Sequence, residues 1–270
     1  MKFAFLTDRI RPQGTADDQL AAAALRARGA SVDFVPWESA EGDYDCWLVR
    51  SPWNYHHHVG EFLDTMSRLE CVVNPPSLLR WNADKSYLVE LAARGVPVIP
   101  TRTCTRDALD LGDWDEVVVK PTVSAAGDGT YRLRRDMIHA DTCGRLPGGR
   151  LLVQPFLPEV LSAGEVSVVL VNGEVTHAVK KTGAPGNFLV HEEHGGRVET
   201  WDVSPRISGL SHDALAAAPS APLYARADWI ETAEGPLLVE LELVEPELFF
   251  RFCPAAAARF AEACIAELRR

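Results

Sequence analysis

The sequence predicts an α/β protein with an N-terminal parallel lobe. Three observations support this prediction. Short apolar runs alternate with a helical segment in the first 50 residues, glycine and proline separate the segments, and the later part of the chain contains two hairpin-like pairs of apolar runs. With 270 residues, the chain is long enough for two or three small lobes.

The charge balance argues against a nucleic-acid partner. Lys and Arg number 27 against 38 Asp and Glu, whereas binding to phosphate backbones needs a clustered basic surface. No uncharged apolar run approaches the roughly 20 residues of a membrane helix, and the first residues do not form a secretory signal. The six cysteines contain no CxxC pair, so no disulfide or zinc framework is expected. We therefore expect a cytoplasmic protein without nucleic-acid or membrane partners.

The first lobe is predicted to span residues 1–77. Its expected elements are a strand at 2–7, a helix capped by Thr15 and stopped by Gly29, strands at 31–37 and 44–50, a helix at 61–69 and a short strand at 71–74. Ligands of parallel sheets bind beyond the carboxyl ends of the strands. Candidate substrate-binding residues there are Arg50, Ser51, Trp53, Asn54 and Tyr55.

The second lobe is predicted over residues 78–153. A helix carrying residues 81–91 and closed by Gly95 precedes strand candidates at 96–99, 116–120 and 151–156. Lys120 ends an apolar strand, four residues before a loop of small residues at 124–130. Small residues let backbone N–H groups approach phosphate oxygens, and the lysine adds a positive charge. A glycine-rich surface hairpin is the alternative interpretation.

The third lobe is predicted over residues 154–270. It should contain a hairpin that begins at Glu165 and turns at Asn172-Gly173, a second pair that turns near Glu234-Gly235, and a helix at 254–268. These pairs predict an antiparallel sheet.

A ladder of carboxylates lies on the second pair of this lobe. Its members are Asp228, Glu240, Glu242, Glu245 and Glu247. Glu240 and Glu242 share one face of an otherwise apolar strand. Like charges there are costly without a cation, and a purely oxygen ligand set suits Mg²⁺. A solvent-facing polar edge is the alternative.

In their order along the chain, these motifs resemble the ATP-grasp superfamily of carboxylate ligases, which includes D-alanine–D-alanine ligase and glutathione synthetase. The resemblance covers nearly the whole chain and implies three lobes, with ATP between the last two. The implied ATP-binding residues are Lys85, Lys120, Ser124, Gly127, Gly129, Gln154, Phe156, Leu157 and Glu165. The implied reaction-centre arginine is Arg226, with Asp228, Glu240 and Glu242 as Mg²⁺ ligands.

The strings RSPWNY, NPPSLLRWNADKSYL, GVPVIPT and ELELVEPELFF resemble the O-ureido-serine cyclo-ligase branch, which forms cycloserine. This resemblance implies an ATP- and Mg²⁺-dependent ligase of specialised metabolism, such as antibiotic biosynthesis. The enzyme would join the carboxylate of a small amino acid or peptide to an amine through an acyl phosphate. Glu245 in the last string is a further candidate for substrate binding, and a homodimer is the assembly we consider.

The chain departs from its relatives near the site. Asn187 and Leu189 stand where relatives carry aspartate and arginine, and a leucine cannot hold a phosphoryl oxygen. Lys180, Lys181 or His191 would have to replace that cation. The alternatives are a nucleotide-binding scaffold with weakened or lost catalysis, and ligation or cyclisation with a non-amine nucleophile.

The histidines and two further departures bear on the substrate. Asn54 and His57 stand where relatives often have aspartate and arginine, which indicates a different substrate. His56, His57 and His58 cannot all reach one ion from a regular strand or helix, so a solvated loop is expected. His191 is also a candidate general base with a pKa near neutrality; an ordinary surface histidine is the alternative.

Overall fold

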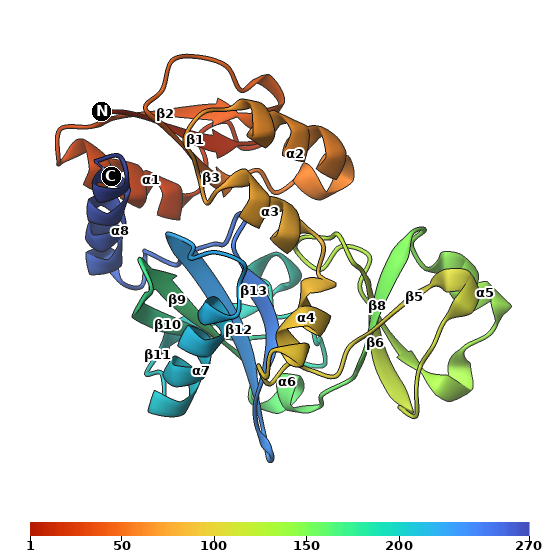
Figure 1. The fold of residues 1–270 in the computed structure, drawn as a ribbon. Coiled ribbons are helices and arrows are strands. Elements are labelled where there is room, and N and C mark those ends of the chain that lie inside the picture. The colour runs from red at the N-terminus through yellow and green to blue at the C-terminus, as the bar shows by residue number, and fades with distance from the viewer. Residues whose placement is uncertain (270) are drawn as a thin grey trace.

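The computed structural model describes residues 1–269 and contains three sheets, each the centre of one part of the molecule (Figure 1). The first sheet is parallel with strand order β2-β1-β3-β4. Its strands are β1 (Lys2–Thr7), β2 (Ser31–Pro36), β3 (Cys46–Ser51) and β4 (Val72–Val73). The predicted parallel N-terminal lobe is therefore confirmed.

Helices cover both faces of this sheet because apolar side chains alternate along β1. Phe3 and Phe5 pack with α1 (Ala16–Arg26), whereas Ala4 and Leu6 face α2 (Val59–Arg68). Thr15 caps α1 as predicted: its side chain accepts a hydrogen bond from the Asp18 N–H, and the Asp18 side chain accepts one from the Thr15 N–H.

The second sheet is antiparallel with strand order β5-β8-β6-β7. Its strands are β5 (Arg102–Thr105), β6 (Glu116–Pro121), β7 (Tyr131–Arg134) and β8 (Arg150–Pro155), and α5 (Ala140–Arg145) lies between β7 and β8 in the chain. The sequence predicted β6 and β8 but neither edge strand. The edge strands are short and half exposed, so they lack the apolar run that identifies a central strand.

The third sheet is antiparallel with strand order β11-β10-β9-β12-β13. Its strands are β9 (Glu165–Val171), β10 (Glu174–Thr182), β11 (Arg197–Trp201), β12 (Tyr224–Thr232) and β13 (Gly235–Glu242). Helices α6 (Glu159–Ser162) and α7 (Pro205–Ala216) belong to this region. Both predicted hairpin turns are present.

The helix predicted over residues 81–91 is two helices, α3 (Pro76–Ala83) and α4 (Tyr87–Ala93). Asp84 causes the break, because its side chain accepts hydrogen bonds from the backbone N–H and hydroxyl of Ser86 at 2.9 and 2.6 Å. The N–H of Lys85 then donates to Thr122 O at 2.6 Å. The break therefore brings Lys85 to the second sheet. The strand predicted at 96–99 is a single bridge from Val98 to Leu238.

Two helices pack against a lobe other than the one to which the predicted boundaries at residues 77 and 153 assign them. The C-terminal helix α8 (Pro254–Glu267) packs beside α1 of the first lobe (Figure 1). Leu88 and Leu91 of α4 pack against the third sheet. β8 ends at Pro155, two residues beyond the predicted boundary at 153, and the contacts of α8 and α4 join the lobes to one another.

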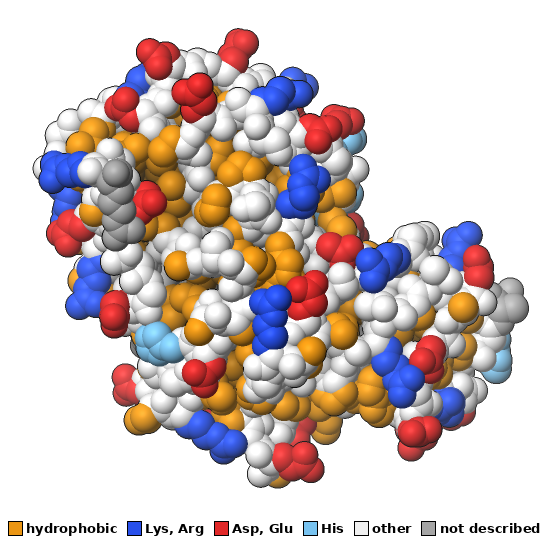
Figure 2. Space-filling model, in the orientation of Figure 1, with side chains coloured by type: hydrophobic (Ala, Val, Ile, Leu, Met, Phe, Trp, Pro, Cys, Tyr) orange, Lys and Arg blue, Asp and Glu red, His pale blue; other side chains and the backbone are white. Residues whose placement is uncertain are grey.

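The surface agrees with the acidic composition. On the face shown in Figure 2, Lys and Arg side chains are interspersed with Asp and Glu and form no large basic patch. None of the helices within residues 1–269 has the length and apolarity of a membrane span. All six cysteines are free thiols.

Asn74 ties the first lobe to the third sheet, and this tie generates a test of stability. Its amide donates to Tyr224 O and Leu243 O at 3.0 and 2.8 Å and accepts from Leu223 N–H at 2.7 Å, all in a fully buried position. Asn74→Ala would leave three buried backbone groups unpaired. We expect urea denaturation to show a loss of about 3 kcal/mol in the free energy of unfolding.

The exposed Gln19 provides the control for this measurement. Gln19→Ala on α1 should change the free energy of unfolding by less than about 0.5 kcal/mol. Equal stability of the Asn74 and Gln19 variants would contradict a structural role for Asn74.

Candidate active site

A cavity of about 350 Å³ is lined by residues of all three lobes. The first lobe contributes Trp53 and Tyr55, the second contributes Lys120, and the third contributes Asp228 and Glu240. The cavity has an apolar end and a strongly charged end. This division suits a ligand that carries both a flat apolar group and several charges.

The apolar end surrounds the segment that follows β8. Phe156 packs there with Ile99, Val160, Val190 and Ile230. Gln154, Phe156 and Leu157 all line the cavity, as the sequence predicted. The side-chain amide of Gln154 donates to the hydroxyl of Thr101 at 2.9 Å, which fixes its orientation.

At the charged end, Glu240 lies between two lysines. Its carboxylate accepts from Lys120 Nζ at 2.9 Å and lies 3.8 Å from Lys85 Nζ. Burial alone would raise the pKa of Glu240, but the charges of Lys120 and Lys85 outweigh burial and lower that pKa to about 2. Lys85 also donates to Ser124 O at 2.6 Å. Both predicted phosphate lysines therefore meet at one predicted metal ligand.

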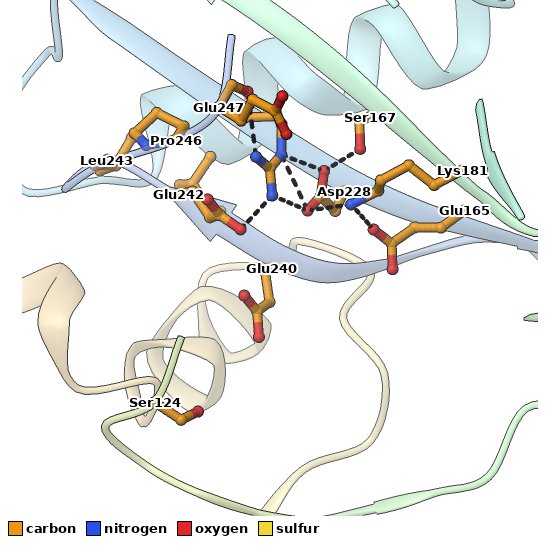
Figure 3. A network of polar contacts seen from close by, with 12 residues as sticks. Ser124, Glu165, Ser167, Lys181, Asp228, Glu240, Glu242, Leu243, Pro246 and Glu247 are labelled. Carbon is orange, nitrogen blue, oxygen red and sulfur yellow. Dashed lines mark hydrogen bonds and ion pairs between the residues drawn. The ribbon is translucent and has the colours of Figure 1, made fainter. Parts of the chain in front are cut away.

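A second network surrounds Asp228 on β12 (Figure 3). The carboxylate of Asp228 accepts from Arg226 Nε and Nη2, both at 2.9 Å, from Lys181 Nζ at 3.2 Å and from Ser167 Oγ at 2.6 Å. Although burial opposes ionisation, Arg226 and Lys181 hold the pKa of Asp228 well below its usual value. Asp228 is thus an anion whose oxygens are already occupied.

The same network extends to the carboxylates on its two sides. Arg226 pairs with Glu242, and Lys181 pairs with Glu165 (Figure 3). Burial raises the pKa of Glu165 to about 7, against the opposing charge of Lys181. The geometry brings together Arg226 and the three predicted metal ligands. It also shows that Glu165, predicted to bind ribose, is already paired.

Lys181, rather than Lys180, is the cavity lysine of β10. Successive strand residues point to opposite faces, so only one of the two neighbours can face the cavity. Lys181 is 4% exposed and lines the cavity, whereas Lys180 Nζ lies outside it, 4.3 Å from the centroid of the Trp201 ring. The structure therefore corrects the choice of Lys180 as a catalytic residue.

The loop of small residues at 124–130 covers part of the cavity. Ser124 and Gly127 line it, but Gly129 packs between Pro121 and Pro147 and does not. Gly127 has φ +75°, and a Cβ there would lie 3.2 Å from Leu189 Cδ2. Leu189 thus packs against the loop, at the position where relatives were expected to carry arginine.

Histidines contact the same loop from two lobes. His56, in a 3-10 turn of the first lobe (Tyr55–His58), lies 3.3 Å from Asp128, and His194 lies 3.2 Å from Ala126 O. A ring nitrogen of His56, a ring nitrogen of His57 and a carboxylate oxygen of Asp128 all lie within 4.8 Å of one another. Two of the three consecutive histidines therefore do converge, together with a residue from another lobe.

His191 differs from its predicted character as a base. Burial lowers its pKa to about 4, and the charges of Lys181 and Arg226 act in the same direction. His191 is therefore uncharged at neutral pH and cannot replace the missing arginine cation. Its Nδ1 atom is buried without a hydrogen-bond partner among the described residues.

Only half of the six predicted substrate residues line the cavity. Trp53, Tyr55 and Glu245 do, whereas Arg50, Ser51 and Asn54 do not. Arg50 Nε donates to Asp18 at 3.2 Å, and Asn54 accepts from Trp37 Nε1 at 2.7 Å. These residues shape the first lobe from within. Arg50 and Ser51 are the last residues of β3, whereas Asn54 directly precedes the 3-10 turn at Tyr55–His58.

Among the lining residues that were not predicted from the sequence are two polar ones, Asn82 and Tyr87. Asn82 donates to Leu241 O and accepts from Leu243 N–H, both at 2.7 Å, and Tyr87 OH accepts from Leu241 N–H at 3.0 Å. They hold the backbone of β13 where its carboxylates emerge. Their proximity to Lys85 in the string NADKSY is the signal that could have identified them.

Comparisons with known proteins agree with this geometry. The family described as D-cycloserine synthetase DcsG, N-terminal domain, matches residues 3–74. The cycloserine biosynthesis protein DcsG of Streptomyces lavendulae is 30% identical over 279 aligned residues, covering 91% of this chain and 92% of that protein. A glutathione synthetase of Prochlorococcus marinus is 27% identical, covering 67% and 66% of the two chains.

Solved structures show the same fold. The crystal structure of D-cycloserine synthetase DcsG superposes with a TM-score of 0.89 at 27% identity, covering 99% of this chain and 100% of that one. The D-alanine–D-alanine ligase of Bacillus anthracis superposes with a TM-score of 0.69 at 14% identity, covering 100% and 98% of the two chains. The latter similarity concerns the fold alone.

The two neighbouring lysines of β10 provide a matched test of the network. Lys181→Met removes a buried cation that pairs with Glu165 and Asp228, so we expect it to lower the free energy of unfolding by about 3 kcal/mol. Lys180→Met loses only a half-exposed contact with Trp201 and should cost less than about 1 kcal/mol. Thermal or urea unfolding measures both. The reverse order of stabilities would contradict the assignment of Lys181 to the buried network.

Proposed function

This chain belongs to the ATP-grasp ligases, in the family of the cycloserine synthetase DcsG, and from this premise we propose its substrate class and the roles of its residues. As a member of that family it is an ATP-dependent carboxylate–amine ligase. We propose that it activates the carboxylate of a small amino acid or peptide as an acyl phosphate and joins it to an amine in antibiotic-type specialised metabolism. ADP and phosphate would be released.

We propose ATP and Mg²⁺ as the cofactors, as in ATP-grasp ligases generally. The apolar end at Phe156 and Leu157 suits the adenine base, and Lys85, Lys120 and the loop at 124–130 suit the phosphates. When bound, Mg²⁺ would supply charge neutralisation on the phosphate oxygens. Glu240 and Glu242 offer the hard oxygen ligands that it prefers.

Asp228 fits the metal less well than these two glutamates. Its oxygens accept from Arg226, Lys181 and Ser167, so coordination by Asp228 would leave these donors unpaired. We assign it the role of holding Arg226 in place. Arg226, paired on its other side with Glu242, would then stabilise negative charge that develops at the reacting carboxylate and phosphoryl group.

The contact that best supports this proposal is Glu240 between Lys85 and Lys120. Without ligand, the acidic and basic residues neutralise one another. The phosphates of ATP would replace Glu240 as partners of the lysines, and Mg²⁺ would replace the lysines as partner of Glu240. Nucleotide and metal should therefore favour each other's binding. Phosphates that bind the lysines free Glu240 for Mg²⁺, and Mg²⁺ that binds Glu240 frees the lysines for the phosphates.

Leu189 supports a second reading of the same site, a nucleotide-binding scaffold with weakened catalysis. An apolar side chain lies against the loop where relatives were expected to carry arginine. Lys181 is the buried cation in this region, but Glu165 and Asp228 already neutralise it. Binding and turnover therefore need separate measurement.

Nucleotide binding is tested by thermal unfolding with ADP, with and without Mg²⁺. A ligand at a hundredfold excess over its dissociation constant stabilises the native state by about 2.7 kcal/mol. We expect a Mg²⁺-dependent rise in melting temperature, and its loss in Lys120→Met. Amino acids that trigger ADP release would establish the ligase reaction. A shift without turnover would support the scaffold reading, and no shift in the wild type would contradict nucleotide binding.

Glu240→Gln tests the exchange of partners at the lysines. We expect half-maximal nucleotide binding to need at least about tenfold more Mg²⁺, since one carboxylate ligand is lost. Binding of ADP without Mg²⁺ should be equal or tighter, because Lys120 loses its counter-charge. The exposed Glu234→Gln serves as control. Unchanged Mg²⁺ dependence, measured by calorimetry, would show that Glu240 is structural.

A further inference from the structure

Carboxylates outnumber cations around the cavity. Among its described lining residues, the lysines and arginine are Lys85, Lys120, Lys181 and Arg226, and the carboxylates are Glu165, Asp228, Glu192, Glu240, Glu242, Glu245 and Glu247. Glu192 and Glu247 both pair with Arg251 outside the lining. Even with Arg251 included, seven carboxylates face five cations, so carboxylates remain in excess.

Glu245 is the carboxylate without a partner. Glu165, Asp228, Glu240 and Glu242 each pair with at least one of the four cations. Among the described side chains, none forms an ion pair or hydrogen bond with the carboxylate of Glu245. Burial raises its pKa to about 8, and the nearby charge of Glu242 acts in the same direction. Without a cationic partner the group is therefore largely protonated near neutral pH, and a cationic ligand would favour its ionised form.

The fold holds Glu245 in place from both sides. On one side, Leu243 O accepts from Asn74 at 2.8 Å; on the other, Pro246 O accepts from Arg50 Nη2 at 3.0 Å. Glu247 O further accepts from Arg226 Nη1 at 3.2 Å. The backbone of this segment is thus fixed by buried side chains, which is the support that a recognition residue needs.

The surroundings of Glu245 suit a small organic cation. Tyr55 and Trp53 of the first lobe line the same cavity. The pKa of Tyr55 is raised well above its usual value, mainly by burial and then by the charge of Glu245, so its phenol lies within the field of that carboxylate. A carboxylate beside aromatic rings combines an ion pair with cation–π attraction.

We propose that Glu245 is the subsite for a primary ammonium group of the substrate, held beside the aromatic ring of Tyr55. This inference rests on the proposed function and adds the charge of one substrate and the residue that recognises it. The substrate would be an amino compound that enters as a cation and neutralises the unpaired carboxylate. A neutral or purely anionic substrate would leave Glu245 protonated and without an ionic partner.

The test uses methylammonium chloride as the probe, with sodium chloride and tetramethylammonium chloride at the same ionic strength. We expect methylammonium to raise the melting temperature of the wild type by about 3 °C at roughly ten times its dissociation constant. Glu245→Gln should abolish this shift. The control Glu247→Gln, which changes a lining carboxylate already paired with Arg251, should retain it.

The outcomes separate this inference from the proposed function. A methylammonium shift that persists in Glu245→Gln, or no shift in the wild type, would overturn the ammonium subsite. A shift of equal size with Mg²⁺ alone that Glu245→Gln abolishes would overturn it in favour of a metal ligand. The ADP–Mg²⁺ shift should remain in Glu245→Gln. Its absence from the wild type would instead refute the proposed nucleotide site.

If Glu245→Gln does not fold, Glu245→Asp provides the second variant. Aspartate keeps the carboxylate, but its side chain is one methylene group shorter, so the carboxylate lies further from the ligand. The rise in melting temperature caused by methylammonium should therefore fall by half or more. A shift equal to that of the wild type would contradict recognition at this position.

Discussion

Charge neutrality in a buried cavity is the constraint on which this structure depends. Removing an ion from water costs several kcal/mol unless an opposite charge or hydrogen bonds replace the lost hydration. Arg226 and Lys181 meet this requirement through Asp228, and Lys85 and Lys120 meet it through Glu240. Because Lys85 and Lys120 belong to the second lobe and Glu240 to the third, their ion pairs also join these two lobes. The cavity therefore holds a set of charges that these ion pairs fix in place.

The sequence predicted the parts of the site that follow from local rules. Strand alternation identified Glu240 and Glu242 as neighbours on one face, and the loop of small residues after Lys120 indicated a phosphate site. It did not distinguish Lys180 from Lys181, since that choice depends on which face of β10 the other lobes cover. The pKa of His191 likewise depends on burial by distant segments, and the side chain of Asn54 is held by Trp37 and Glu38.

For the fold as well, some elements were predicted from the sequence and others were not. Central strands and hairpin turns carry strong signals, whereas the half-exposed edge strands β5 and β7 do not. The helix break at Asp84 could not be read from apolar periodicity, yet it determines where Lys85 lies. The contact between α8 and α1 joins the two ends of the chain and follows from no local pattern. Local propensity thus predicted the elements, and tertiary packing determined which of them build the site.

The contact between His56 and Asp128 affects how such ligases can diversify. His56 lies in the lobe that presents Trp53 and Tyr55, whereas Asp128 lies in the loop expected to cover the phosphates. The segment proposed to select the substrate and the loop proposed to bind the phosphates are therefore in direct contact. A lineage that remodelled its first lobe for a new substrate would also alter a support of its phosphate loop. Successful change would need matched substitutions in both segments, so residues 56 and 128 should evolve together.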